Sequence, residues 1–180
     1  LAITLALIAC GPAAPMSTEH PRAERTAPCT PGMHDAVGDD LTFECIASGV
    51  WMFTALAPAD FEYPRYPANG LVIEAADQRA SGGSRLDHAI LIDTGWSDAQ
   101  AEAIAAWSVL PVTAALVTHF HDDRTGGARA LMSAHVPVFG TARTIELATA
   151  RGEPVPDHEL LEGSLPEVQW YYPGPAHSPD

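Results

Sequence analysis

The apolar and polar positions along the chain follow two patterns, a series of short strands and then helices and strands in alternation. Short apolar or alternating stretches bounded by Gly, Pro, Asn or Ser are typical of strands. Strands are predicted at residues 41–47, 50–56, 71–75, 89–93, 113–117, 136–139 and 167–172. Ser48-Gly49 separates the first two stretches and indicates a hairpin.

Helices are predicted where apolar residues recur at helical spacing behind a capping residue. Ser97 followed by Gln100 forms a capping box, apolar residues at helical spacing come next, and Pro111 follows the helix end. Two further helices are predicted at 128–134 and 141–150. This order of elements predicts an α/β layered fold with functional groups on loops at the strand ends.

The beginning of the chain has the pattern of an export signal. Residues 1–9 form an apolar run of signal-peptide type that is too short to span a bilayer. Cys10 ends a stretch similar to a lipoprotein-processing box and would become lipidated; the alternative is an ordinary export signal with an incidental cysteine. We expect a signal-peptide remnant at 1–10, a flexible tether or N-terminal arm at 11–40, and a domain at 41–180. The expected location is the periplasm, with attachment to the outer membrane through Cys10.

Composition and charge favour a single acidic domain. The chain has 180 residues, of which 47% are hydrophobic, and this is enough to build one core. The net charge is −14 and all nine basic residues are arginine, so no basic stripe is available for nucleic acid. We expect a monomer without a nucleic-acid partner. Cys29 and Cys45 either pair in an oxidising compartment or stay unpaired, and their spacing argues against zinc binding.

Residues 118–127, directly after an apolar stretch, carry the most informative motif. Residues i and i+2 of an extended segment point to the same side, so His119 and His121 can bind one metal ion. A catalytic zinc site usually has three protein ligands and one open position. His177, in a Gly/Pro-framed turn, is the best candidate for the third ligand, although taken alone it would be an ordinary surface histidine. Asp123 would act on a neighbouring metal or on bound water; its alternative role is to orient a histidine.

The run His-Phe-His-Asp-Asp-Arg-Thr-Gly-Gly at 119–127 resembles the metal motif of the metallo-β-lactamases. The resemblance covers residues 43–180 and is greatest for the Verona integron-encoded type. Supporting motifs stand in the right order at 69–73, 92–96, 160–163 and 172–180. In related hydrolases of this superfold a metal-binding histidine follows the aspartate of the motif. Arg124 takes that place here, and His119 together with Arg124 resembles the first subclass of the class B enzymes.

The resemblance implies an αβ/βα sandwich whose C-terminal part is absent from this chain. It implies one complete zinc site at His119, His121 and His177. Of a second zinc site it implies only Asp123, with a cysteine and a histidine expected beyond Asp180. The implied reaction is hydrolysis of the β-lactam amide of penicillins, cephalosporins and carbapenems, which confers antibiotic resistance, with Asp123 orienting the attacking water.

The remaining expectations concern the loop at 57–69 and two other functions. Phe61, Tyr63 and Tyr66 would form a flap over the apolar side of the substrate; the alternative is a hairpin loop pinned by aromatic packing. Asp93, after an apolar strand, is expected to be a buried structural carboxylate beside the site. The alternative functions are hydrolysis of a thioester or lactone on the same fold, and an inactive zinc-binding fragment.

Overall fold

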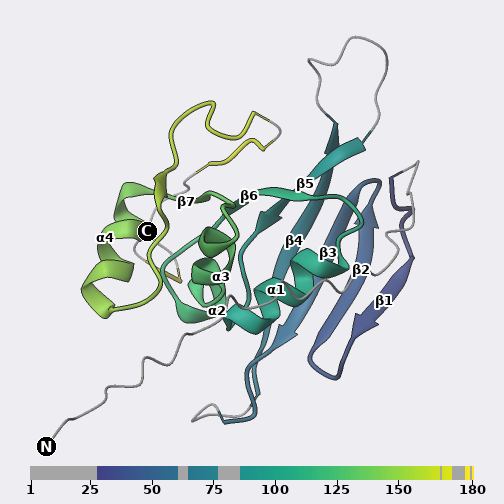
Figure 1. Ribbon diagram of the computed structural model, residues 1–180, viewed down its shortest axis with the longest axis horizontal. Helices are drawn as coiled ribbons and strands as arrows, with labels where there is room; N and C mark the ends of the chain where they lie inside the picture. The colour runs from purple at the N-terminus through teal and green to yellow at the C-terminus, as the bar shows by residue number, and fades with distance from the viewer. Residues whose placement is uncertain (1–27, 61–64, 77–85, 167, 172–176, 179) are drawn as a thin grey trace, which may run out of the picture.

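A mixed β-sheet is the central element of this computed structural model, which describes residues 28–60, 65–76, 86–166, 168–171, 177, 178 and 180 (Figure 1). Within these residues the sheet has eight strands in chain order. They are β1 (His34–Val37), β2 (Leu41–Ala47), β3 (Val50–Leu56), β4 (Pro67–Ala76), β5 (Leu86–Ile92), β6 (Val112–Leu116), β7 (Val138–Gly140) and β8 (His158–Glu159). Neighbours from β1 to β5 are antiparallel, and those from β5 to β8 are parallel.

Most of the predicted strands are confirmed. β2 and β3 have the predicted bounds and meet at the predicted hairpin, while β4 to β7 contain most of the predicted residues but begin or end at other positions. β8 was not predicted, because its two residues are exposed and leave no hydrophobic pattern.

The predicted helices are also present. The described residues contain α1 (Asp98–Trp107), α2 (Asp122–Thr125), α3 (Ala128–Ser133) and α4 (Ala142–Arg151). Ser97 caps α1 through its side chain, which accepts a hydrogen bond from the backbone N–H of Gln100 at 3.3 Å. The Gln100 side chain does not complete a capping box, because its Oε1 accepts from the N–H of Trp96 instead. The four-residue helix α2 was missed because it is too short to show a helical period.

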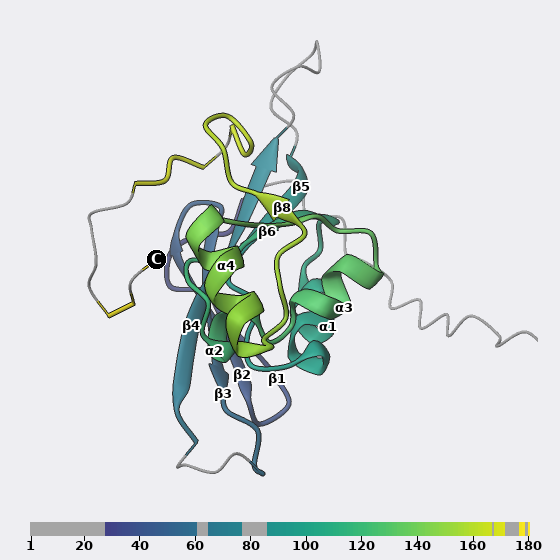
Figure 2. The same cartoon turned by 90° about the vertical axis from the view of Figure 1, so that its left-hand side faces the viewer.

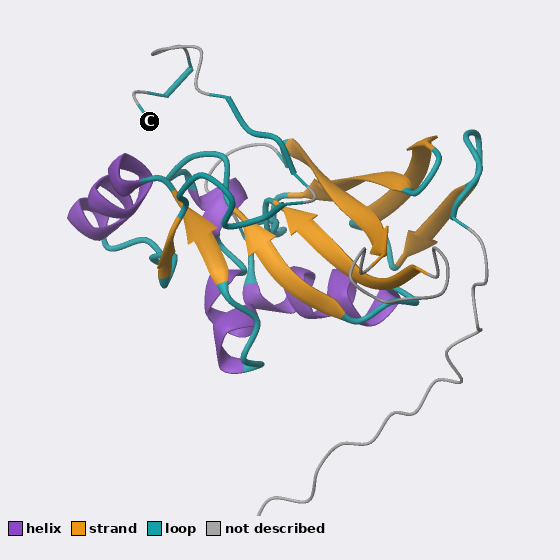
Figure 3. Cartoon of the chain, turned by 90° about the horizontal axis from the view of Figure 1, so that it is seen from above, coloured by secondary structure: helices purple, strands orange, loops and turns teal. Residues whose placement is uncertain are grey.

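The main core lies between one face of the sheet and the helices α1 and α3, which lie side by side on that face (Figures 2 and 3). The alternation in β2 explains the sheet side of this core, since Phe43 and Cys45 are buried and their neighbours are exposed. From α1, Ile104 is fully buried, and the ring of Trp107 stacks on Phe43 with centroids 3.7 Å apart. Burial of this apolar surface is the main stabilising contribution at this face.

A smaller apolar cluster covers part of the other face. Alternate residues of β6 divide between the two, with Ala115 in the main core and Leu116 in the second cluster. Leu160 and Leu165, from the segment after β8, pack against this second cluster. Both faces of β6 are therefore covered by protein, which is typical of parallel strands.

The predicted arm at 11–40 is corrected where the structure describes it. Residues 34–37 form β1 at the edge of the sheet, paired with β2, and Cys29 is 2% exposed. Cys29 forms a disulfide with Cys45 of β2, which resolves the alternatives left open by the sequence. Because β1 is held by backbone hydrogen bonds and its side chains are mostly exposed, the hydrophobic pattern could not reveal it. The folded domain therefore includes residues 28–40.

The predicted strand at 167–172 is wrong in its described part. Residues 168–171 are irregular, and Trp170 and Tyr171 are 42% and 84% exposed. A strand needs a neighbour that supplies a hydrogen-bond ladder, and no described strand lies in register with this segment. Cys10, Phe61, Tyr63 and residues 77–85 lie outside the described residues. None of the described helices is long and apolar enough to cross a bilayer.

Candidate metal centre

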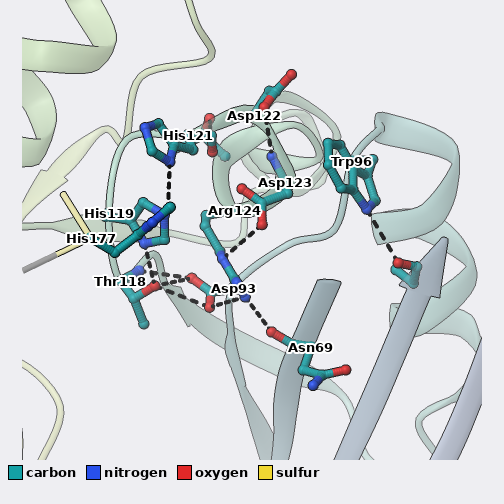
Figure 4. A network of polar contacts seen from close by, with 12 residues as sticks. Asn69, Asp93, Trp96, Thr118, His119, His121, Asp122, Asp123, Arg124 and His177 are labelled. Carbon is teal, nitrogen blue, oxygen red and sulfur yellow. Dashed lines mark hydrogen bonds and ion pairs between the residues drawn. The ribbon is translucent and has the colours of Figure 1, made fainter. Parts of the chain in front are cut away.

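Three histidines lie together beyond the carboxyl ends of the parallel strands β5 and β6 (Figure 4). One ligand atom from each of His119, His121 and His177 lies within 4.8 Å of the other two. The closest pair is His177 Nε2 and His121 Nδ1, at 3.2 Å. The structure thus brings the three predicted ligands together, although they come from segments far apart in the sequence.

The path of the chain after β6 explains why two of the ligands come from one short segment. Phe120 is 6% exposed and packs inward, while His119 and His121 on either side of it are partly exposed. Residues 118–121 form a bend after β6 and not an extended segment, and within this bend the phenyl ring is buried while the two imidazoles lie with His177. At Asp122 the chain enters α2.

Thr118 and Asp93 orient the ring of His119. The N–H and hydroxyl of Thr118 both donate to the Asp93 carboxylate, with distances to Oδ1 of 2.8 and 2.9 Å. Because the hydroxyl proton is used in this way, the Thr118 oxygen accepts from His119 Nδ1, 3.1 Å away. Nδ1 then carries the ring proton, and Nε2 keeps a lone pair for a metal. His119 Nε2 is buried and has no hydrogen-bond partner within the described part of the chain.

The donor set fits a zinc ion. Burial, assisted by the positive charge of Arg124, lowers the pKa of His119 from 6.5 to about 4. The ring is therefore neutral at pH 7, which is the protonation state that binds metal. Three imidazole nitrogens suit Zn²⁺, whereas Ca²⁺ and Mg²⁺ prefer oxygen ligands. The unpartnered Nε2 of His119 marks where the ligand atoms converge.

A partly buried network of charged side chains lies beside the histidines (Figure 4). Arg124 NH1 is 3.2 Å from Asp93 Oδ2 and donates to the backbone carbonyl of Asn69, while Arg124 Nε is 3.1 Å from Asp123 Oδ2. The last contact is an ion pair by distance, but its N–H is not aligned for a hydrogen bond. Asp93 is 4% exposed, and burial raises its pKa from 3.8 to about 6 despite the opposing effects of Thr118 and Arg124.

The glycines after the histidine motif are required for close packing. A Cβ at Gly127 would lie 2.3 Å from Ala101 Cβ, and one at Gly126 would lie 2.4 Å from the Trp96 backbone. The Gly127 N–H donates to Thr94 Oγ1, and that hydroxyl donates to the Arg124 carbonyl. Gly126-Gly127 therefore lets the loop from β6 approach the loop from β5, which places Arg124 beside Asp93.

The other predicted site residues that the structure describes lie outside the three-histidine group. Asp123 lies outside the three-histidine group and pairs with Arg124. Tyr66 is 52% exposed, and its backbone carbonyl accepts from Ala57 across the loop that the sequence assigned to a flap. Phe61, Tyr63 and Cys10 lie outside the described residues.

Sequence reasoning missed the support role of Thr118. The signal was available, since a hydroxyl residue directly precedes His119, and Asp93 ends the neighbouring parallel strand.

Comparisons with known proteins agree with this fold. A family model described as the metallo-beta-lactamase superfamily matches residues 85–179. Metallo-beta-lactamase type 2 of Bacteroides fragilis is 28% identical over 154 residues, covering 80% of this chain and 57% of that protein. The Bacillus cereus protein of the same name is 30% identical over 141 residues, covering 73% and 50%.

Solved structures of metallo-β-lactamases are similar as well. The protein from Erythrobacter litoralis has a TM-score of 0.69 and 31% identity, covering 82% of this chain and 66% of that chain. The protein from Hirschia baltica has a TM-score of 0.64 and 34% identity, covering 79% and 64%. FIM-1 from Pseudomonas aeruginosa, solved in its mono-zinc form, has a TM-score of 0.58 and 32% identity, covering 70% and 52%.

The fold and the histidine group together define a mixed α/β protein with a candidate three-histidine metal site. The chain belongs to the metallo-β-lactamase superfamily, and the predicted fold class is confirmed. It spans about half the length of the curated relatives that it matches. The greater resemblance to the Verona integron-encoded type, like the assignment to the first subclass, stays a prediction.

Proposed function

We propose that this protein is a zinc-dependent β-lactamase, which hydrolyses the ring amide of penicillins, cephalosporins and carbapenems and so confers antibiotic resistance. The observation that carries the proposal is the convergence of His119, His121 and His177, with the buried Nε2 of His119 left without a partner. The similar proteins named metallo-beta-lactamase support the substrate class.

In the proposed site the three imidazoles hold the metal, and the residues beneath them keep those imidazoles in place. A zinc ion bound there would supply Lewis acidity and make a water nucleophile available at neutral pH. Thr118 fixes the proton of His119 on Nδ1, so that Nε2 is the ligand atom. Asp93 fixes Thr118 in turn.

Asp123 is proposed as the residue that orients the attacking water and contributes to a second zinc site. Asp123 follows His121 by two positions, and its carboxylate lies 3.1 Å from Arg124 Nε. A carboxylate fixed in this way is preorganised to accept a proton or a hydrogen bond without first being immobilised. Tyr66, exposed on the 57–69 loop, is proposed to contact the apolar side of the substrate.

We also propose export to the periplasm, with anchoring to the outer membrane through Cys10, and action as a monomer. The buried disulfide between Cys29 and Cys45 supports an oxidising compartment, where such bonds form and persist. Labelling cells with a palmitate analogue would test the anchor, since a Cys10→Ser variant should lose the label.

The function is tested by comparing the parent protein, as the full chain, with His121→Ala and with the control His34→Ala. His34 is an exposed histidine of the edge strand β1, outside the metal group. The parent and the control should hydrolyse a chromogenic cephalosporin and a carbapenem, and chelator should abolish the activity. His121→Ala should be inactive. Hydrolysis that survives both His121→Ala and the chelator would refute the proposed function.

The same purified protein can be used to distinguish the proposed function from two others. A thioester or lactone hydrolase should turn over those substrates faster than the cephalosporin; the arginine at position 124, where related hydrolases have a metal-binding histidine, argues against it. An inactive zinc-binding protein should bind zinc without turnover of any of these substrates.

A further inference from the structure

The three histidines come from two segments of the chain, and the ligands alone do not fix these segments relative to each other. Two ligands belong to the segment after β6, but His177 is 56 positions from His121. The two segments approach through their imidazoles and are not neighbouring strands. A metal site of this kind needs a contact that fixes one segment against the other.

Phe120 is the point at which the two segments are joined. Its backbone N–H donates to Asp180 Oδ2 at 2.9 Å, across 60 positions of sequence. Its ring is 6% exposed, and the Arg151 guanidinium at the end of α4 lies 5.1 Å above the ring centroid. Phe120 is therefore held by its backbone on one side and by its ring on the other, directly between His119 and His121.

Asp180 uses its two carboxylate oxygens for two different segments. Oδ2 accepts from the Phe120 N–H, and Oδ1 accepts from the Ser178 hydroxyl. Ser178 follows His177 directly and is 8% exposed. One carboxylate thus connects the residue beside the third ligand to the residue between the first two ligands.

We infer that Asp180 is a positioning residue for zinc: its carboxylate fixes the His177 segment against the 119–121 segment, so that the three imidazoles converge. The inference rests on the zinc site of the proposed function. A hydrogen bond from a backbone N–H to a carboxylate is charge-assisted and stronger than a neutral one. Loss of a residue that supports a ligand typically weakens metal binding about 10- to 100-fold.

Asp157 offers a matched control elsewhere in the fold. Its Oδ1 accepts a hydrogen bond from the backbone N–H of Val138, at 2.8 Å and across 19 positions. The bond has the same chemistry as the one between Phe120 and Asp180, but neither of its partners belongs to the histidine group. Asp157→Ala therefore reports the general cost of losing such a bond.

The test compares Asp180→Ala, Asp180→Asn and Asp157→Ala in the full chain. Zinc affinity is measured by competition with a chromophoric chelator, and exchange of the Phe120 amide hydrogen is followed by NMR in the metal-free protein. We expect Asp180→Ala to weaken zinc binding about 10- to 100-fold and to make the Phe120 amide exchange faster. Asp180→Asn, which keeps an acceptor oxygen, should bind zinc within about threefold of the parent, and Asp157→Ala should bind it like the parent.

Two outcomes would overturn the inference. One is a zinc affinity for Asp180→Ala equal to that of Asp157→Ala; the other is a Phe120 amide that stays protected without the carboxylate. If Asp180→Ala does not fold, an Asp180→Asn variant that folds with an exchanging Phe120 amide but binds zinc like the parent would equally contradict it. Neither readout uses a β-lactam, so failure of the proposed reaction would leave the inference standing. A parent that binds no zinc would overturn both.

Discussion

Asp93 allows a test of whether burial or ion pairing dominates beneath the metal centre. The carboxylate is 4% exposed and lies 3.2 Å from Arg124. Burial has a larger effect on its pKa than the ion pair, since the pKa of Asp93 is raised from 3.8 to about 6. Below pH 3.8 the group is protonated in the folded and unfolded protein, and its contribution to stability is fully present. Between 3.8 and about 6 only the unfolded chain loses the proton, so the free energy of unfolding falls as the pH rises.

The expected size of the effect follows from these two pKa values. A pKa of about 6 in place of 3.8 corresponds to about 3 kcal/mol, at roughly 1.4 kcal/mol per pH unit. This contribution is lost once the pH exceeds the folded pKa. Asp93→Asn removes the titration and keeps an oxygen that can accept from the Thr118 N–H.

The assay is urea unfolding of the metal-free parent and of Asp93→Asn from pH 4 to pH 8. The stability of the parent relative to Asp93→Asn should fall by about 3 kcal/mol between pH 4 and pH 7. Other titrating groups, including His119, are common to both proteins and cancel in the difference. A relative stability that rises with pH would show that the Arg124 ion pair outweighs burial, and would refute the reasoning.

Three further predictions concern His119, the disulfide and the core. Because the pKa of His119 is lowered to about 4, the metal-free parent should gain stability relative to His119→Gln as the pH rises from 4 to 6.5; chemical denaturation would measure it, and a flat difference would contradict the burial of this ring. Replacing Cys29 and Cys45 by serine opens a link with a sequence separation of 16, which should cost about 3 kcal/mol in urea unfolding; unchanged stability would show that the N-terminal segment does not depend on the bond. Ile104→Ala should cost about 2–5 kcal/mol, because Ile104 is fully buried against the sheet. A smaller loss in thermal or urea unfolding would mean that the core between α1 and the sheet refills the space.

Much of the fold could be predicted because its signals are local. The hairpin at Ser48-Gly49 and the start of α1 at Ser97 depend on residues within a few positions of one another. β1 gave no such signal, since an edge strand with exposed side chains is defined by the backbone hydrogen bonds of β2. The strand predicted at 167–172 shows the converse error, because a suitable pattern does not form a strand without a neighbour in register.

The site also has a part with local sequence signals and a part that depends on distant partners. His119 and His121 were predictable from their i, i+2 spacing after an apolar stretch, and His177 from its Gly/Pro-framed turn and then from the resemblance to the metallo-β-lactamases. The residues that orient these ligands were harder to recognise, because their partners are backbone groups and distant side chains. Thr118 is held by Asp93, which follows β5, and Asp180 acts through the backbone N–H of Phe120.

The supports of the three ligands are contacts within the protein itself. His119 is held from beneath by Thr118 and Asp93, and the 119–121 segment is tied to the segment of the third ligand through Asp180. Because these contacts restrict the imidazoles within the folded protein, less ordering entropy should be lost when zinc binds. Burial keeps His119 neutral, so a metal does not have to displace a proton from it at pH 7. Affinity for zinc should therefore depend on Thr118, Asp93 and Asp180, because these residues keep the ligand set preorganised.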